Sequence, residues 1–207
     1  MREEATRAAA TLASQPVQGE AGASERGQPL ARILAATARG EEAERLLRAC
    51  VDEWSELLGE AHPQVAVERS RLAALLSERG QHVEAQTLAR ATWRALDSVL
   101  GADHLWTTRA RRTLGLVLHA AGAFDAAEAE LTAACQAASR AEPGTEKLAV
   151  DCALALAACL RARGCEDQAR AVLLSAREHV TASSASGGKL HASWTAALDA
   201  GLLSDLR

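Results

Sequence analysis

The 207-residue chain contains no tyrosine, one phenylalanine, one methionine and four prolines. Sandwiches and barrels of β-strands fill their cores with β-branched and aromatic side chains, so this scarcity disfavours both folds. The chain is nevertheless 48% hydrophobic, and most of that content is alanine and leucine. A chain of this length can bury a sizeable core, and alanine and leucine suit close packing of helices. We therefore expect an all-α protein.

The chain also lacks a basic excess and long apolar runs. Its formal net charge of −4 argues against nucleic-acid binding through a bulk positive field, and few aromatic side chains are available to stack on bases. No apolar run approaches the ~20 residues that span a bilayer, and the N-terminal stretch lacks the apolar core of a signal peptide. We expect a cytoplasmic protein that binds neither nucleic acid nor a membrane.

Residue sets that carry chemistry are missing from the sequence as well. The five cysteines contain no CxxC pair, and most of them occupy positions where other parts of the chain carry apolar residues. We interpret them as small buried hydrophobes in a reducing compartment, since no zinc-ligand spacing is present. A carboxylate pair, a nucleophile with its base and a phosphate-binding loop are also missing. We therefore predict no enzymatic activity, no catalytic residue, no metal and no cofactor.

A repeat of 42 positions dominates what the sequence does contain. The segment LGEAHPQV, from Leu58 to Val65, returns 42 residues later as LGADHLWT, from Leu100 to Thr107. A fixed period of this size indicates stacked structural repeats. Four columns align over four periods: Leu30, Leu72, Leu114 and Leu156; Leu34, Leu76, Leu118 and Leu160; Ala38, Gly80, Gly122 and Gly164; Ala43, Ala85, Ala127 and Ala169.

These columns describe a helical hairpin. Leucines at i and i+4 form an apolar stripe on a first helix, and glycine suits the left-handed turn that ends it. The alanine that follows begins a second helix where the two must cross closely. One hairpin cannot bury its own stripe, so we predict an α-solenoid of stacked antiparallel hairpins.

The predicted domains follow from the columns. Residues 1–28 form an N-terminal helix and flexible loop, and residues 29–181 hold four repeats at about 29–58, 62–100, 105–141 and 146–181. A loop at 182–188 leads to a C-terminal capping helix at 189–207. Repeat arrays need a polar-backed terminal helix to cover the last apolar stripe.

The pattern LGxxHP, then Leu-Ala-x-x-Leu, glycine and alanine resembles the 42-residue tetratricopeptide repeats of kinesin light chain and its bacterial relatives. The segment from Gly122 to Leu131, GAFDAAEAEL, matches the turn of that family best. The chain departs from the pattern at Ala38, at Leu105 in place of proline, and at Glu146 in place of histidine. The resemblance implies an adaptor or scaffold that binds a protein or peptide partner.

His62 and His104 occupy the same position of two repeats, at the start of a helix. A catalytic or metal role needs partners that converge on both, yet they lie one whole repeat apart. We expect each imidazole either to cap free backbone donors of the helix that follows or to pack under the preceding loop.

In tetratricopeptide arrays the first helix of each repeat lines the concave groove, so the resemblance implies a set of groove residues. They are Arg32, Ser70, Arg109, Arg112, Leu116, His119, Asp151 and Arg161. Basic side chains around an apolar strip favour a partner segment that carries acidic residues, because the arginine fork pairs with carboxylates. Trp106 and Trp194 match no apolar column, which makes them candidates for a secondary contact or for a homodimer.

Two other interpretations are compatible with these residues. The RARR segment from Arg109 to Arg112 could be a solvated helix face that binds nothing. Alternatively, the protein could be an enzyme or bind a small molecule in a pocket of the superhelix near His119 and Asp151, which the family pattern projects into the groove from adjacent repeats.

Overall fold

The computed structural model describes residues 40–140, 145–183 and 189–203. These residues form eight α-helices, and every regular element among them is helical. The chain divides into two compact units, residues 1–96 and 97–207, which are described separately. The predicted N-terminal helix and loop at 1–28, Arg32 and the first helix of the first repeat lie outside the described residues.

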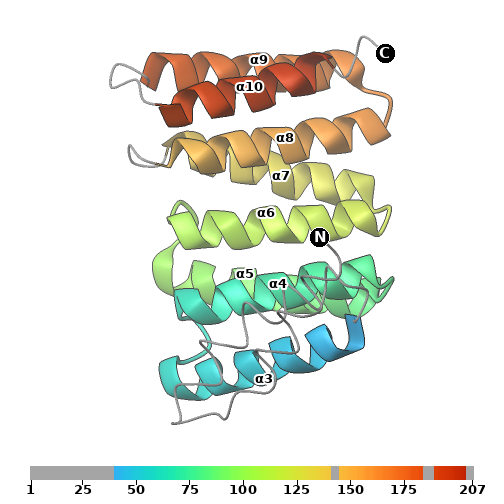
Figure 1. Ribbon diagram of the computed structural model, residues 1–207, viewed down its shortest axis with the longest axis vertical. Helices are drawn as coiled ribbons and strands as arrows, with labels where there is room; N and C mark the ends of the chain where they lie inside the picture. Colours follow the sequence, from blue (N-terminus) through green and yellow to red (C-terminus); the bar gives the residue numbers. More distant parts are fainter. Residues whose placement is uncertain (1–39, 141–144, 184–188, 204–207) are drawn as a thin grey trace, which may run out of the picture. The chain divides into compact units, whose positions relative to one another are not determined.

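The first unit contains α3 (Gly40–Leu58), α4 (Pro63–Glu78) and most of α5 (His82–Leu100). The helix α3 is the second helix of the first predicted repeat, and it packs on α4 (Figure 1). Their facing stripes are buried, with Leu47 at 4%, Leu72 at 2% and Leu76 at 0% exposure. At the start of α5, the side chains of Ala85 and Ala89 are also buried.

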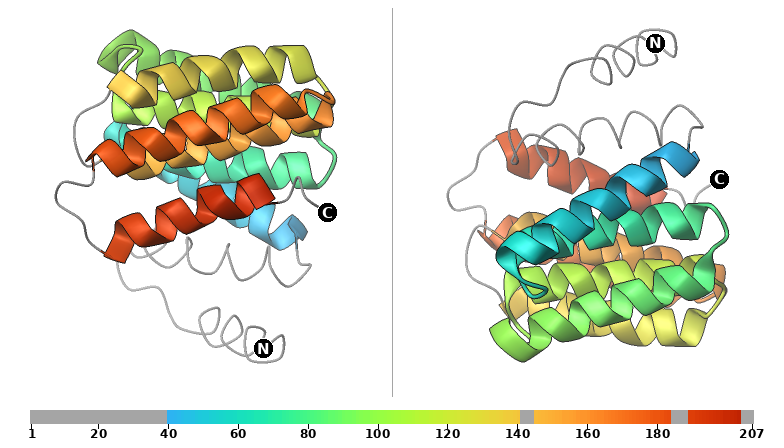
Figure 2. Two further views of the ribbon diagram at one scale, coloured as in Figure 1. Left: turned by 90° about the horizontal axis from the view of Figure 1, so that it is seen from above. Right: turned by 90° about the horizontal axis from the view of Figure 1, so that it is seen from below.

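The second unit contains the last turn of α5 and five further helices. They are α6 (Leu105–Ala120), α7 (Phe124–Arg140), α8 (Glu146–Ala162), α9 (Glu166–Ser183) and α10 (Lys189–Leu203). Two hairpins, α6 with α7 and α8 with α9, pack through α7 and α8, and α6 also touches α8. The helix α10 packs on α8 and α9, with the Leu198 side chain fully buried, and it lies beside α9 in the view from above (Figure 2).

The sequence columns form the core of this all-α stack. In the described repeats the leucines of both columns are between 0% and 4% exposed, and the alanines that begin the second helices are 0% exposed. The predicted fold class of stacked antiparallel helical hairpins is confirmed. The 42-residue period therefore arises from side chains that face a neighbouring helix at the same point of each repeat.

The turn inside each hairpin depends on a glycine. Gly80, Gly122 and Gly164 have φ angles of +78°, +76° and +75°, a left-handed conformation that a side chain with a Cβ adopts only at a cost. The next backbone N–H then donates to a carbonyl of the last helical turn, for example from Cys165 to Leu160 over 2.9 Å. These bonds satisfy carbonyls that the end of the helix leaves free.

Both repeated histidines cap helices, as expected. The Gln64 N–H donates to His62 Nδ1 over 3.1 Å, and the Trp106 N–H donates to His104 Nδ1 over 3.2 Å. Each bond satisfies one of the backbone donors that the first turn of a helix leaves unpaired.

Within the described residues, no helix has the length and apolar content that crossing a membrane requires.

Candidate functional site

The exposed face of α6 carries four of the predicted contact residues: Trp106, Arg109, Arg112 and Leu116. They recur at spacings of three and four residues, which places them on one side of the helix. Arg109 is exposed, Leu116 is 37% exposed, and the other two are half-buried. We call these four residues the α6 face.

Trp106 and Arg109 lie in direct contact. The guanidinium carbon of Arg109 lies 5.0 Å from the centroid of the Trp106 ring, within the range of a cation–π interaction. Stacking on the ring holds the planar guanidinium and leaves its N–H edges for an acceptor. The sequence analysis assigned Trp106 to a separate secondary surface, whereas the structure makes it part of the same face as Arg109.

Neither Arg109 nor Arg112 forms an ion pair with any described residue. The Nε of Arg112 is buried and has no hydrogen-bond acceptor within the described part of the chain. By contrast, Arg111 lies 3.4 Å from Glu130 and so joins α6 to α7 within the hairpin. The RARR segment therefore has one arginine used in packing and two whose charge is left unpaired.

Asp151 and Arg161, two predicted groove residues on α8, are already engaged. Lys147 Nζ lies 2.8 Å from Asp151 Oδ2, an i, i+4 pair on the same helix. Arg161 donates to the Gly201 carbonyl over 2.8 Å and lies 3.5 Å from Glu166. Because the last carbonyls of a helix lack partners within that helix, Arg161 stabilises the end of α10.

His119 and Asp151 do not form an acid–base pair. The two helices α6 and α8 run in the same direction (Figure 1), and the residue of α8 equivalent to His119 is Arg161. Asp151 precedes Arg161 by ten residues, about 15 Å along the helix axis. The His119 ring instead contacts Phe124, edge to face, with centroids 5.4 Å apart. The hypothesis of a reactive pocket at His119 and Asp151 loses its geometric support.

The remaining predicted residues are dispersed. Ser70 lies half-buried on α4 in the first unit, and Trp194 lies half-buried on α10 in the second. Arg32 falls outside the described residues. Among the residues that the structure describes, no group of three or more His, Cys, Asp or Glu could hold a metal ion.

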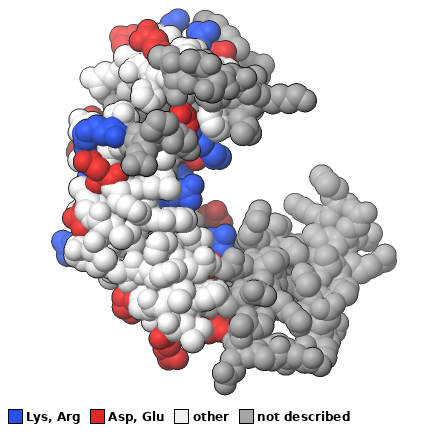
Figure 3. All heavy atoms as spheres, turned by 90° about the vertical axis from the view of Figure 1, so that its left-hand side faces the viewer, with Lys and Arg blue, Asp and Glu red and all other residues white. Residues whose placement is uncertain are grey.

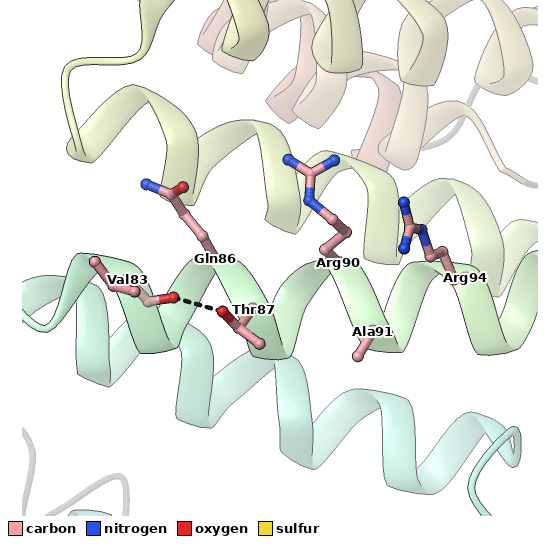
Figure 4. Close-up of a pocket in the computed structure, with 6 residues that line it drawn as sticks. All are labelled: Val83, Gln86, Thr87, Arg90, Ala91 and Arg94. Carbon is pink, nitrogen blue, oxygen red and sulfur yellow. Dashed lines mark hydrogen bonds between the residues drawn. The ribbon is translucent and has the colours of Figure 1, made fainter.

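A second pair of unpaired arginines lies on α5, where sequence reasoning did not look. Gln86, Arg90 and Arg94 follow one another along the helix beside a cavity of about 340 Å³ (Figure 4). Neither arginine has an ion pair in the described ranges, and the neighbouring Val83 is 82% exposed. The family resemblance implied groove residues on first helices, whereas α5 is a second helix. The sequence does indicate that Arg90 lacks an ion pair on its own helix, since no carboxylate lies three or four residues from it.

Charge is otherwise mixed over the described surface. On the face drawn in Figure 3, atoms of acidic and basic side chains lie interspersed among uncharged ones. Ion pairs between neighbouring helices account for part of this pattern, as between Arg48 and Glu84 at 2.6 Å. Recognition of a charged partner would thus depend on local groups such as Arg109 and Arg112.

The described helices define an α-solenoid whose α6 face carries Trp106, Arg109, Arg112 and Leu116. Residues 67–140 match the family model of the tetratricopeptide repeat, as the columns of this segment predict. Repeats of this family generally mediate protein–protein interaction. The relation to the kinesin light chain type in particular stays a prediction.

Among solved structures, 27 chains match the fold. One is the crystal structure of BtubC (BKLC) from P. vanneervenii, with a TM-score of 0.66 and 15% identity, covering 87% of this chain and 72% of that chain. At this identity the likeness shows the fold alone. A search of curated proteins finds no match.

Proposed function

We propose that this protein is an adaptor or scaffold that binds a partner segment with acidic residues and an apolar anchor on the α6 face. The observation that carries the proposal is the absence of any carboxylate partner for Arg109 and Arg112 within the described residues, beside Trp106 and Leu116. The other arginines of α6 and α8 have partners. Arg111 pairs with Glu130, and Arg161 donates to a carbonyl of α10.

The chemistry of the α6 face suits an acidic segment. A guanidinium presents paired N–H groups that match a carboxylate in a bidentate geometry. Stacking on Trp106 restricts Arg109 before binding, which lowers the entropy lost when a partner is bound. Arg112 has no ion-pair partner among the described residues, which leaves its charge for a bound carboxylate.

An apolar anchor would complete the contact. Leu116 is 37% exposed at the C-terminal half of the α6 face, two turns beyond Arg109. Tryptophan and arginine are enriched among residues that dominate binding energy at interfaces. A partner with a hydrophobic residue flanked by aspartate or glutamate would therefore contact both kinds of group at once.

The test is selection of peptides from a random displayed library, followed by affinity measurement on the best sequence by fluorescence polarisation. We expect selected peptides to be enriched in aspartate and glutamate around one apolar residue. We expect Arg109→Glu/Arg112→Glu to weaken binding by about a hundredfold or more, since each lost charged contact costs ~1.5–3 kcal/mol. Affinity for the wild type should fall as salt rises.

The matched control is Arg90→Glu/Arg94→Glu, which changes the net charge equally on α5. Circular dichroism confirms that both variants fold. If the control loses binding and the α6 variant keeps it, the site lies on α5 and the proposal is wrong. If neutral peptides are selected, the acidic specificity is wrong. Sedimentation velocity of the free protein separates peptide binding from a homodimer formed through Trp106 and Trp194.

A further inference from the structure

Two cysteines from adjacent helices meet inside the second unit. Cys135 on α7 packs against the buried cluster that contains Cys152 on α8, and neither is in a disulfide. Both belong to a small apolar cluster with Ala134, Ala138 and Leu148. The sequence interpretation treated each cysteine as a separate buried hydrophobe, and it did not anticipate that two of them would be neighbours.

The two thiols differ in their access to solvent. Cys152 is 0% exposed, whereas Cys135 is half-buried. Cys135 also lines a cavity of about 450 Å³ between α7, α8 and α9, whose floor includes Ala149 and Ala153 of α8. A small reagent in the cavity can thus reach Cys135, whereas Cys152 has no exposed surface.

We propose that Cys135 and Cys152 are a site of reversible oxidation, at which a hydroperoxide converts the two thiols into a disulfide that links α7 to α8. This proposal does not rest on a partner of the α6 face, although Arg112 of that face acts electrostatically on Cys152. Disulfides in reducing compartments are usually transient and redox-sensing, and two free thiols packed in one cluster fit that role better than a structural disulfide.

The reaction balances in two steps. The thiolate of Cys135 attacks one peroxide oxygen, the O–O bond breaks, and the products are Cys135 sulfenic acid and water from hydrogen peroxide. The Cys152 sulfur then attacks the Cys135 sulfur, the S–O bond breaks, and a second water leaves with the Cys152 proton. In total the two sulfur atoms lose two electrons, which reduce one peroxide to two waters.

The surroundings determine the order of these steps. The contact with Cys135, and then burial, raise the pKa of Cys152, so Cys152 stays protonated and does not react first. The positive charge of Arg112 acts in the opposite direction on Cys152, which helps that thiol to lose its proton once Cys135 is oxidised. Disulfide formation requires the sulfurs to come to bonding distance, about 2.05 Å, and the neighbouring Ala134 and Ala149 have small side chains.

The experiment uses the reduced full-length chain, a slight excess of hydrogen peroxide, and alkylation of the remaining thiols after unfolding. Mass spectrometry of a non-reduced digest should show the peptide with Cys135 joined to the peptide with Cys152, and dithiothreitol should release both. Cys152 and Cys159 lie on one tryptic peptide, residues 148–161, so fragmentation within that peptide must locate the link at Cys152.

Variants distinguish this site from general thiol oxidation. Cys152→Ser should trap Cys135 as a sulfenic acid and raise its labelling by dimedone about tenfold over the wild type, because the resolving thiol is gone. Cys135→Ser should leave Cys152 in the thiol form. Cys165→Ser is the matched control, since Cys165 is also half-buried, and it should form the link as the wild type does.

Three results would overturn the proposal: a link from Cys135 to Cys159 or Cys165, covalent dimers as the main product, or equal dimedone labelling of the wild type and Cys152→Ser. Should the serine at this buried position disturb folding by circular dichroism, Cys152→Ala provides the same comparison without a buried hydroxyl.

Discussion

Gly115 of α6 lies directly against Leu131 of α7, so closely that a Cβ on Gly115 would stand 2.5 Å from Leu131 Cγ. Both residues belong to the hairpin of the third repeat, and Leu131 is fully buried. One period earlier the equivalent residues are Ala73 and Ala89, and one period later Ala157 and Leu173. The two helices of each repeat therefore pack at this point through a different pair of residues.

This contact predicts an unusual effect of alanine in a helix. Gly115→Ala should gain up to about 1 kcal/mol of helix propensity, but overpacking against Leu131 should cost ~1–3 kcal/mol. We expect a net loss of stability, measured as a lower urea midpoint at an unchanged m-value.

The double variant Gly115→Ala/Leu131→Ala reproduces the pair that the second repeat carries. Leu131→Ala alone should destabilise by ~2–5 kcal/mol, and the double variant should lose less than the sum of the two single effects. Strict additivity would show that Gly115 and Leu131 do not constrain each other.

The histidine cap of α6 predicts how stability responds to substitution of His104. His104→Ala removes the acceptor of the Trp106 N–H and should cost about 1 kcal/mol of unfolding free energy. His104→Asp restores an acceptor and adds negative charge at the helix N-terminus, so it should recover that stability. Urea unfolding of the three proteins at neutral pH measures both effects. If alanine and aspartate were equivalent at position 104, the cap would contribute nothing.

How well the sequence predicts each feature depends on the physical origin of that feature. Leu72, Leu114 and Leu156 coincide at the 42-residue period because each must fill the same space between helices. The core and the glycine turns were therefore predictable from one chain. The hydrogen bond from Arg161 to the Gly201 carbonyl was not predictable, because it depends on where α10 ends against α8.

Side-chain conformation limited the prediction of the α6 face. The spacing of Trp106 and Arg109 allows contact, but only the rotamers of the two side chains place the guanidinium over the ring. The packing of Cys135 against the cluster with Cys152 depends on how α7 crosses α8, which the repeat columns do not encode. Arg90 and Arg94 were not predicted, because the family pattern assigns the groove to first helices and α5 is a second helix.

A buried carboxyl on α4 predicts how stability depends on pH. Glu68 is 0% exposed where the next two repeats have Ala110 and Cys152. Burial raises the pKa of Glu68, although Arg71 Nη1, 2.8 Å away, and Gln64 counteract the effect. One of its oxygens has no partner among the described residues.

Because the pKa of Glu68 is higher in the folded state than in the unfolded chain, the folded state binds the proton more tightly. The stability that this proton contributes is present at acidic pH and is lost as pH rises from about 4.3, the unfolded value, through the folded pKa. Glu68→Gln removes this loss and should stabilise the protein by about 1 kcal/mol at pH 7, with a smaller gain at pH 4.

Thermal unfolding of the wild type and Glu68→Gln between pH 4 and pH 8 tests this dependence. Arg71→Gln is the control, because it removes the cation that partly offsets the burial of Glu68 and should lower stability at pH 7. A Glu68→Gln variant less stable than the wild type at pH 7 would show that the bond to Arg71 outweighs the cost of burial.

The contact between α7 and α8 has an ionic component that recurs two periods apart. Arg163, just after α8, pairs with Glu128 and lies 2.7 Å from Asp125, both near the start of α7. In the first unit Arg79 lies 3.3 Å from Glu44 and 3.7 Å from Glu41, the residues two periods earlier in the same columns. Arg163 follows a helix C-terminus, where a cation is also favoured by the helix dipole.

Arg163→Glu should therefore destabilise the protein, whereas Arg163→Glu/Glu128→Arg should recover part of the loss by restoring opposite charges. Asp125 is 91% exposed while Glu128 is 30% exposed, so we expect the coupling energy, about 0.2–1 kcal/mol, to come mainly from Glu128. A double-mutant cycle measured by urea unfolding at low salt gives this energy. Repeating the cycle in 1 M NaCl should reduce it, because the Debye length falls to about 3 Å. A coupling energy of zero at low salt would mean that apolar packing alone holds α7 against α8.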